Sequence, residues 1–392
     1  MTAEQANIEC IMFADDLSGA CDTGVQFARR GMSCRVQLRV SERTTTATTE
    51  VLVFNTNSRN DTAVQCQRKI EEVARHFSHL KADIIFKKVD STLRGQVGEE
   101  IATALRAFKC EAAIIAPAFP GMRRFVRGGI LHWVDCSGGG QVDIRGLLAK
   151  QGVPLEKLAL MRSASRNPLN FASDLNMHRV NGKVFFIADC ESQDDLHLAV
   201  TAGMQAPCRF LWVGSAGLGI AVADYLAKSQ TQKPLSPIAD APVMFVIGST
   251  HLATARQKRA LLDITGAVEV RPGPETIGIA RHALRDKRHL VVSIAPVNPS
   301  DLSLQQFFVS LEGIRIAAIF LTGGDTGMLV CNVIGAHSID LRDEVATGFP
   351  WGILCGGMFH GLPVASKSGS FGDEDVLVRC AEFFAPARKA MR

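Results

Sequence analysis

Two adjacent carboxylates mark the stretch of the sequence that is richest in reactive groups, FADDLSGACDTG at residues 13–24. Asp15 and Asp16 come directly after an apolar run, and Ser18 and Asp22 follow shortly. Either Ser18 or Asp22 would cap the helix that comes next, and one such residue is enough for a cap. Two neighbouring carboxylates repel each other unless a cation, a proton-transfer role or a hydroxylated ligand engages them. The pair therefore favours a catalytic or polyol-binding site over a purely structural role.

A second polar cluster follows another apolar run, in KKVDSTLRGQVGEEI at residues 87–101. Asp90, Ser91 and Arg94 lie in one compact turn. The planar guanidinium of Arg94 suits a carboxylate or a phosphate, whereas Ser91 could instead cap the next helix.

A third candidate is the basic segment after the proline turn APAFP at residues 116–120. Arg123, Arg124 and Arg127 follow a backbone that two prolines constrain. These arginines could bind an anion or form a solvated surface, and the residues alone leave both interpretations open.

The C-terminal part of the chain has three glycine-bearing turns, and the first two follow apolar runs. Such turns expose backbone N–H groups at the positive end of a helix, which favours phosphate. Asp325, in one of them, could hold Mg²⁺ or one of its waters. The Walker A pattern is absent, and no GxGxxG follows the first apolar run, so the turns predict a nucleotide site of another kind. They are VIGSTHLAT (246–254), LTGGDTG (321–327) and SKSGSFGDED (366–375).

The polar clusters and glycine turns must be positioned by regular elements. Along the chain, short and continuously apolar runs alternate with amphipathic helical stretches. That alternation predicts two α/β domains, each a mostly parallel sheet flanked by helices, with an active-site cleft between them. In such sheets ligands bind beyond the carboxyl ends of the strands, where the polar clusters lie. We expect strands at 8–14, 50–56, 82–89, 111–117, 183–189, 209–215, 242–249, 289–295 and 317–324.

The chain has 392 residues, more than one ordinary core accommodates. The polar, proline-containing segment SQTQKPLSPIADAP at 229–242 is typical of a linker. We therefore expect a domain at 1–230 that binds the small-molecule substrate and a nucleotide-binding domain at 240–392. The glycine-rich segment DCSGGGQVDI at 135–144 is expected to be a surface loop.

The composition narrows the functional classes. A net charge of +4, with no basic run interleaved with aromatic residues, argues against nucleic acid. No apolar run is long enough to span a membrane, and the N-terminal residues do not resemble a secretory signal. Eleven cysteines without a CxxC pair are typical of reduced cysteines in a cytoplasmic protein. The sequence leaves a homodimer open.

Carboxylates and arginine in the first domain suit a hydroxy acid, and the glycine turns of the second suit a nucleotide. Together they predict phosphoryl transfer from a nucleotide to a small hydroxy acid across the cleft between the domains. A nucleotide-dependent oxidoreductase is one alternative, although the missing GxGxxG argues against it. A non-catalytic sensor of a sugar acid and a nucleotide is another.

The chain resembles the four-carbon acid sugar kinases, a family once described as a domain of unknown function, over nearly its whole length. The blocks ADDLSGACDTG and KKVDSTLRGQVGEEI are the most specific matches, and APAFP, VGSAGLG, VIGS, LTGGDTG and KSGSFGDED match in order. The resemblance implies an ATP-dependent enzyme that uses Mg²⁺ and acts on D-threonate, D-erythronate or a 3-oxo-tetronate.

The resemblance implies that Asp15, Asp16, Ser91 and Arg94 bind the sugar acid. It also implies that ATP is bound by Ser249, Gly323, Gly324, Asp325, Thr326, Ser368, Gly369 and Ser370. Asp90 and Arg124 are further predicted substrate-binding residues. As a mechanism we predict that Arg94 and Ser91 hold the acceptor carboxylate and a neighbouring hydroxyl, that Asp15 or Asp16 takes the proton of the acceptor hydroxyl, and that Asp325 contacts the metal.

Two departures from the family pattern concern the substrate side. Where the family continues its proline turn with Gly-Arg-Thr, this chain has Arg123, Arg124 and Phe125. The loop that normally follows is replaced by DCSGGGQVDI. An acceptor other than threonate or erythronate therefore stays open.

Overall fold

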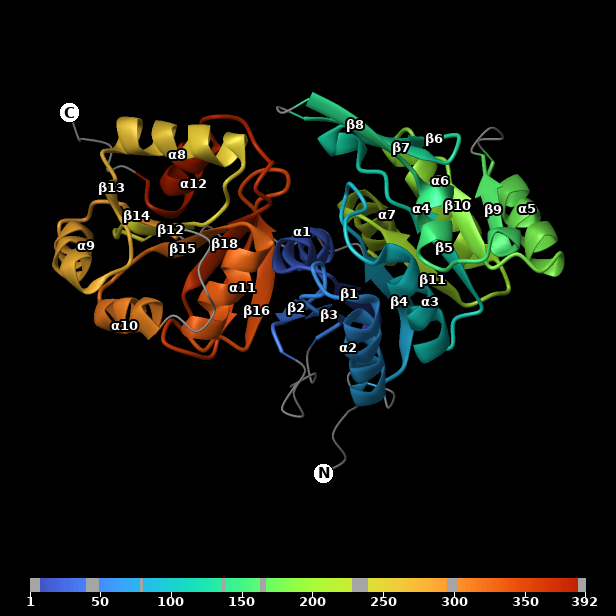
Figure 1. Cartoon of the computed structure of the whole chain (residues 1–392), viewed down its shortest axis with the longest axis horizontal. Helices are drawn as coiled ribbons and strands as arrows, with labels where there is room; N and C mark the ends of the chain where they lie inside the picture. The colour runs from blue at the N-terminus through green and yellow to red at the C-terminus, as the bar shows by residue number, and fades with distance from the viewer. Residues whose placement is uncertain are drawn as a thin grey trace. The chain divides into compact units, whose positions relative to one another are not determined.

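The computed structural model describes residues 8–39, 49–77, 80–135, 138–162, 167–227, 239–294 and 302–386. The chain divides into two compact units, Met1–Gln232 and Lys233–Arg392. Each unit has a sheet with helices on both faces (Figure 1). Most of the predicted linker, 228–238, lies outside the described residues, so the domain boundary stays a prediction. In the part of the chain that is described, no helix has the length and apolarity to cross a membrane.

The sheet of the first unit is entirely parallel, and its central strands are buried apolar runs. The chain leaves β1 for strands on one side of it and then crosses to β4 on the other side. The strand order therefore reverses at β1, where doubly wound sheets place their ligands. The order is β2 (Cys34–Gln37), β3 (Val51–Asn55), β1 (Ile8–Ala14), β4 (Ala82–Lys88), β11 (Phe210–Gly214), β5 (Ala112–Ala116), β10 (Phe185–Ala188) and β9 (Leu158–Met161).

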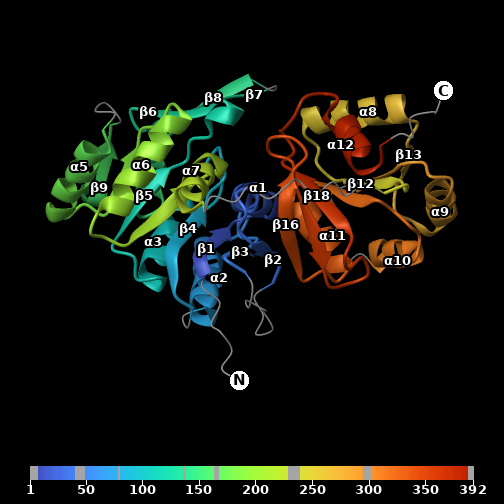
Figure 2. The same cartoon turned by 180° about the vertical axis from the view of Figure 1, so that it is seen from behind.

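Helices cover both faces of this sheet, because parallel strands need crossovers of one hand and the chain winds in both directions (Figures 1 and 2). One face carries α2 (Ala63–His76), α3 (Val97–Ala107) and α4 (Ile144–Lys150). The other carries α1 (Leu17–Ala28), α5 (Pro168–Val180), α6 (Gln193–Gln205) and α7 (Ala216–Leu226).

A separate antiparallel sheet follows the proline turn: β6 (Arg124–Arg127), β7 (Ile130–Asp135) and β8 (Gly138–Asp143). The loop predicted for 135–144 is wrong, because Gly138–Asp143 pairs with β7 along its length. The glycines suit this strand, since a Cβ on Gly140 would lie 2.2 Å from the ring of Trp133. The structure describes nothing at 136–137.

The sheet of the second unit is parallel over its first five strands and antiparallel at β17 and β16. Its order is β13 (Val268–Val270), β14 (Leu290–Ser293), β12 (Val243–Ile247), β15 (Ala318–Thr322), β18 (Pro363–Lys367), β17 (Pro350–Cys355) and β16 (Ser338–Glu344). One face carries α8 (Leu252–Thr265) and α12 (Val376–Phe384), and the other α9 (Ile277–Arg285), α10 (Leu302–Leu311) and α11 (Gly324–Val333) (Figure 1). The predicted α/β class with mostly parallel sheets is confirmed.

Candidate active site

Three neighbouring strands of the first unit end at the same level. Ala14, the last residue of β1, pairs with Asn55 of β3 and with Lys88 of β4. The segments that follow these strands therefore leave the sheet side by side. They bring together the carboxylate pair, the turn at 56–59 and Asp90, at the edge where parallel sheets bind ligands.

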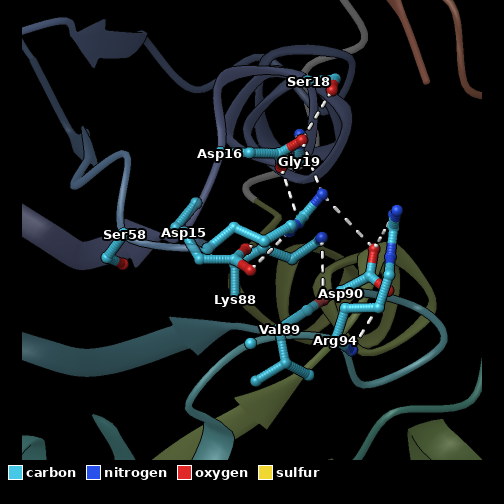
Figure 3. Close-up of polar contacts among 12 residues, drawn as sticks. Asp15, Asp16, Ser18, Gly19, Ser58, Lys88, Val89, Asp90 and Arg94 are labelled. Carbon is cyan, nitrogen blue, oxygen red and sulfur yellow. Dashed lines mark hydrogen bonds and ion pairs between the residues drawn. The ribbon is translucent and has the colours of Figure 1, made fainter. Parts of the chain in front are cut away.

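Asp16 is the N-cap of α1. Its Oδ1 accepts the backbone N–H of Gly19 at 2.9 Å, and its Oδ2 accepts the Ser18 hydroxyl at 2.8 Å (Figure 3). The expectation that Ser18 or Asp22 would cap this helix is wrong, because the helix begins earlier, at Leu17. The cap and the candidate catalytic carboxylate are thus the same residue.

Arg59 binds both members of the carboxylate pair. Its Nε and one terminal nitrogen donate to Asp15 at 2.8 and 2.9 Å, and its two terminal nitrogens donate to Asp16 at 2.9 Å each. The guanidinium also lies 3.5 Å from Oδ1 of Asp90. Sequence reasoning missed Arg59, although the polar run NTNSRND after the predicted strand at 50–56 was a usable signal.

Asp90 and Arg94 form a two-pronged ion pair. Nε and Nη2 of Arg94 donate to the two carboxylate oxygens at 2.9 and 2.8 Å, and Thr92 donates its backbone N–H and its hydroxyl to Oδ2. The Arg94 side chain is nevertheless 63% exposed. Among the described residues its Nη1 has no hydrogen-bond acceptor, so that edge of the guanidinium is open to an anion.

Lys88 places a buried cation beside the same carboxylates. The residue is 3% exposed, and its ammonium donates to the carbonyl of Val89 at 2.9 Å (Figure 3). A Cβ on Gly19 would lie 2.6 Å from Oδ1 of Asp16 and 2.8 Å from this ammonium, so α1 passes close over Lys88 at this glycine. Lys88 was not among the predicted site residues.

Charge, rather than burial, sets the protonation of this cluster. Burial acts to raise the pKa of Asp15, but the charges of Arg59, Lys87 and Lys88 and the hydrogen bonds from Arg59 overcome it and lower the pKa. Burial likewise opposes ionisation of Asp90, and Arg94 and Arg59 hold its pKa well below the usual range. Burial favours the neutral form of Arg59, yet Asp16 and Asp15 raise its pKa. Asp15 and Asp90 are therefore carboxylates at neutral pH.

The other predicted substrate-side residues lie at the edges of this cluster or in the proline turn. Ser91 is half-buried between Asp90 and Thr92. Arg124 is buried at the start of β6, and its guanidinium donates to the Met122 carbonyl at 2.7 Å, within its own turn. The substrate roles of Ser91 and Arg124 stay predictions.

The three glycine turns of the second unit also meet at one edge. They follow β12, β15 and β18, which are adjacent and parallel, with Ile247 level with Thr322 and Thr322 level with Lys367. The turns touch closely: a Cβ on Gly369 would lie 2.3 Å from Oγ of Ser249. A Cβ on Gly248 would lie 2.2 Å from Oγ1 of Thr326.

The start of α11 offers the backbone donors that phosphates use. Gly323 is its N-cap, with a φ of 90° and no side-chain cap, and its own N–H donates to the Lys367 carbonyl at 2.9 Å. The N–H groups of the first helical turn, at the predicted residues Gly324, Asp325 and Thr326, lie at the positive end of the helix.

Buried side chains hold the third turn, which carries the predicted residues Ser368, Gly369 and Ser370. Lys367 is 1% exposed, and its ammonium donates to the carbonyls of Ser368 and Gly369 at 2.9 and 3.1 Å. The amide of Gln257 donates to three further carbonyls, those of residues 371–373. The turn is therefore a rigid wall of the candidate nucleotide site.

Within the described residues, no group of three His, Cys, Asp or Glu side chains could hold a metal ion alone. Asp325 is an exposed carboxylate in the first turn of α11. One carboxylate beside a phosphate cradle fits Mg²⁺, which proteins hold with one or two carboxylates and the substrate's phosphates.

Two family models match the chain. Residues 10–222, more than half of it, match a "Sugar-binding N-terminal domain", and residues 303–377 match a "Nucleotide-binding C-terminal domain". The chain belongs to the four-carbon acid sugar kinase family. It is therefore an enzyme, a phosphotransferase with an alcohol group as acceptor.

Relatives of this kinase cover almost its whole length. It is 30% identical to the D-threonate kinase of Bordetella bronchiseptica, over 94% of this chain and 96% of the relative. It is 28% identical to the D-threonate kinase of Salmonella typhimurium, over 94% of this chain and 97% of that relative. A crystal structure of a Haemophilus influenzae protein shares the fold with a TM-score of 0.74 at 18% identity, over 95% and 100% of the two chains.

Proposed function

We propose that this protein transfers the γ-phosphoryl group of ATP to a hydroxyl of a four-carbon sugar acid, with D-threonate as the first candidate. The observation that carries the proposal is the cluster of Asp15, Asp16, Asp90, Arg59 and Arg94, which combines three carboxylates with an open guanidinium edge. The likeness to D-threonate kinases over the full length supports the choice of acceptor.

In this proposal Arg94 binds the acceptor carboxylate. Its inner edge is held by Asp90, so the guanidinium is oriented before the substrate arrives, and its outer edge is open. Ser91, next in the chain to Asp90, donates to a neighbouring oxygen of the acid. Arg124 binds further along the acceptor. A pre-oriented fork costs little entropy on binding and fixes the acid end of the substrate.

One of the pair Asp15 and Asp16 orients the acceptor hydroxyl and takes its proton as the phosphoryl group is transferred. For Asp15, a lowered pKa is compatible with this role, because positioning and charge neutralisation dominate phosphoryl transfer. Arg59 keeps both carboxylates in place and offsets their mutual repulsion.

On the second unit, the N–H groups at the start of α11 and the walls formed by Ser249 and the 368–370 turn cradle the ATP phosphates. Asp325 is the candidate contact of Mg²⁺, which neutralises charge on the phosphates when bound. The cytoplasmic location expected from the sequence is part of the same proposal.

The test is an ATP-coupled screen of the purified protein against D-threonate, D-erythronate and 3-oxo-tetronates, with the phosphorylated product identified by mass spectrometry. Threitol, which lacks the carboxylate, is the matched control acceptor. We expect turnover with at least one sugar acid and a kcat/KM for threitol lower by about a hundredfold or more, since the Arg94 contact is lost. ATP-dependent turnover of none of the acids, or equal turnover of threitol, would contradict the proposal.

A further inference from the structure

A buried ion pair lies beneath the carboxylate cluster, and the proposed chemistry makes no use of it. Nζ of Lys87, in β4, is 3.0 Å from Oε2 of Glu100, in α3, and the two side chains are 0% and 3% exposed. The Lys87 ammonium also lies 5.5 Å from the centre of the Phe13 ring. Burying two charges is costly, so pairs like this one are weak evidence for stability alone.

The second oxygen of Glu100 connects this pair to the turn that carries Arg59. Ser58 donates its hydroxyl to Oε1 of Glu100 at 2.6 Å, and the Ser58 and Thr56 hydroxyls are 2.8 Å apart. Thr56 in turn donates its hydroxyl to the Ala14 carbonyl at 2.8 Å. Both Ser58 and Glu100 are buried.

The same turn is hydrogen-bonded to the backbone of the carboxylate pair. The N–H groups of Ser58 and Arg59 donate to the Asp15 carbonyl at 2.9 and 3.2 Å, and that of Thr56 donates to the Ala14 carbonyl at 2.8 Å. Glu100 therefore contacts, directly or through Ser58, the three segments that supply the cluster: β4, the end of β1 and the turn after β3.

We infer that Glu100 is a positioning residue: by pairing with Lys87 and accepting from Ser58, it fixes the 56–59 turn and so aims Arg59 at Asp15 and Asp16. The part of this inference that concerns the acceptor rests on the proposed function, whereas the part that concerns the turn does not. A side chain that acts in this way changes acceptor kinetics without touching the substrate.

Amide hydrogen exchange tests the turn without requiring activity. In Glu100→Gln we expect the amides of Ser58 and Arg59 to exchange at least about tenfold faster than in the wild type. Thr103→Val is the matched control, because Thr103 is buried in the same helix and its hydroxyl donates to Glu99, at 3.2 Å, away from the turn. Its turn amides should exchange as in the wild type.

Steady-state kinetics test the consequence for the acceptor. Glu100→Gln should raise the KM for the sugar acid by about tenfold while the KM for ATP stays within about twofold, a split that a general loss of stability would not produce. Combined with Arg59→Lys, it should add little to the loss caused by Arg59→Lys alone, because both changes act through the same guanidinium.

If Glu100→Gln does not fold, Ser58→Ala is the second variant, because it keeps the buried ion pair and removes the hydroxyl that connects Glu100 to the turn and contacts Thr56. Ser58→Ala should also speed exchange of the turn amides and raise the KM for the sugar acid, each by about threefold. Unchanged exchange of the Ser58 and Arg59 amides, or unchanged acceptor KM in an active enzyme, would overturn the inference. A wild type inactive on every acid would instead overturn the proposed function, and the exchange data would still decide the role of Glu100.

Discussion

At the scale of single residues, one guanidinium organises the candidate acceptor site. Arg59 contacts Asp15, Asp16 and Asp90, and its side chain is only 14% exposed. No other type of side chain offers five donors in a rigid plane. Without it, Asp15 and Asp16, which are nearly buried, would lose the four hydrogen bonds that hold them side by side.

Replacing Arg59 with lysine should therefore impair the acceptor side selectively. A lysine ammonium keeps the charge but cannot hydrogen-bond two carboxylates in one plane, so we expect kcat/KM for the sugar acid to fall by roughly ten- to a hundredfold. Arg30→Lys is the matched control, since Arg30, in the turn after α1, pairs with Asp224 of α7 and not with the carboxylate cluster. Steady-state kinetics that show both variants within about twofold of the wild type would contradict the role of Arg59.

The lowered pKa values of Asp15 and Asp90 make a prediction about stability. A carboxylate whose pKa is depressed by folding contributes stability above its unfolded pKa, near about 4, and loses it as pH falls through the folded pKa. The free energy of unfolding should thus decrease as pH is lowered below about 4. Asp90→Asn should flatten this decrease in urea titrations at several pH values. An unchanged slope would show that Asp90 is not ionised and paired in the folded state.

At the scale of elements, close contact between turns defines the nucleotide side. Gly369 lies against Ser249, and Gly248 lies against Thr326, so neither position has room for a side chain. These contacts join the segments after β12, β15 and β18 into one surface.

Gly369→Ala should displace the 368–370 turn, because its Cβ would lie 2.3 Å from Oγ of Ser249. We expect the KM for ATP to rise by about tenfold or more, with little change in the KM for the sugar acid. Gly278→Ala is the control, because a Cβ added to this helical glycine of the same unit would have nothing within 4 Å. Alanine there should stabilise α9 by about 0.5–1 kcal/mol without affecting either KM.

The turn after β5 has a conformational feature that bears on one departure from the family pattern. Arg123 stands where the family has glycine, and its φ is +57°, in the left-handed region that glycine adopts at no steric cost. Arg123→Gly should therefore leave the melting temperature unchanged or raise it, with a gain in stability below about 1 kcal/mol. A clear destabilisation would show that the Arg123 side chain contributes contacts that outweigh its backbone strain.

Strands could be predicted from the sequence where burial on both faces makes them continuously apolar, and were missed elsewhere. Each of the nine predicted strands is present within one or two residues, because buried parallel strands are continuous apolar runs. Short or antiparallel strands such as β8 and β16 were missed, since glycine-rich or alternating segments carry no such signal. Arg59 was missed because its proximity to Asp15 depends on β3 pairing with β1, a register that one sequence does not display.

At the scale of the whole molecule, the chain combines two α/β units that match a sugar-binding and a nucleotide-binding domain model. The boundary predicted at 230–240 stays a prediction, because most of that segment lies outside the described residues. The two units should be separable in function: changes in the first should affect the acceptor, and changes in the second should affect ATP.

The most direct test of the central claim is the turnover of Asp15→Asn and Asp16→Asn with ATP and the best sugar acid, alongside ATP-induced thermal stabilisation. Asparagine preserves the N-cap of α1, so loss of folding does not confuse the result at Asp16. We predict that at least one variant loses about a hundredfold or more in kcat while ATP still stabilises both as it does the wild type. Turnover within about twofold of the wild type in both variants would contradict the claim that this carboxylate pair performs the acceptor chemistry.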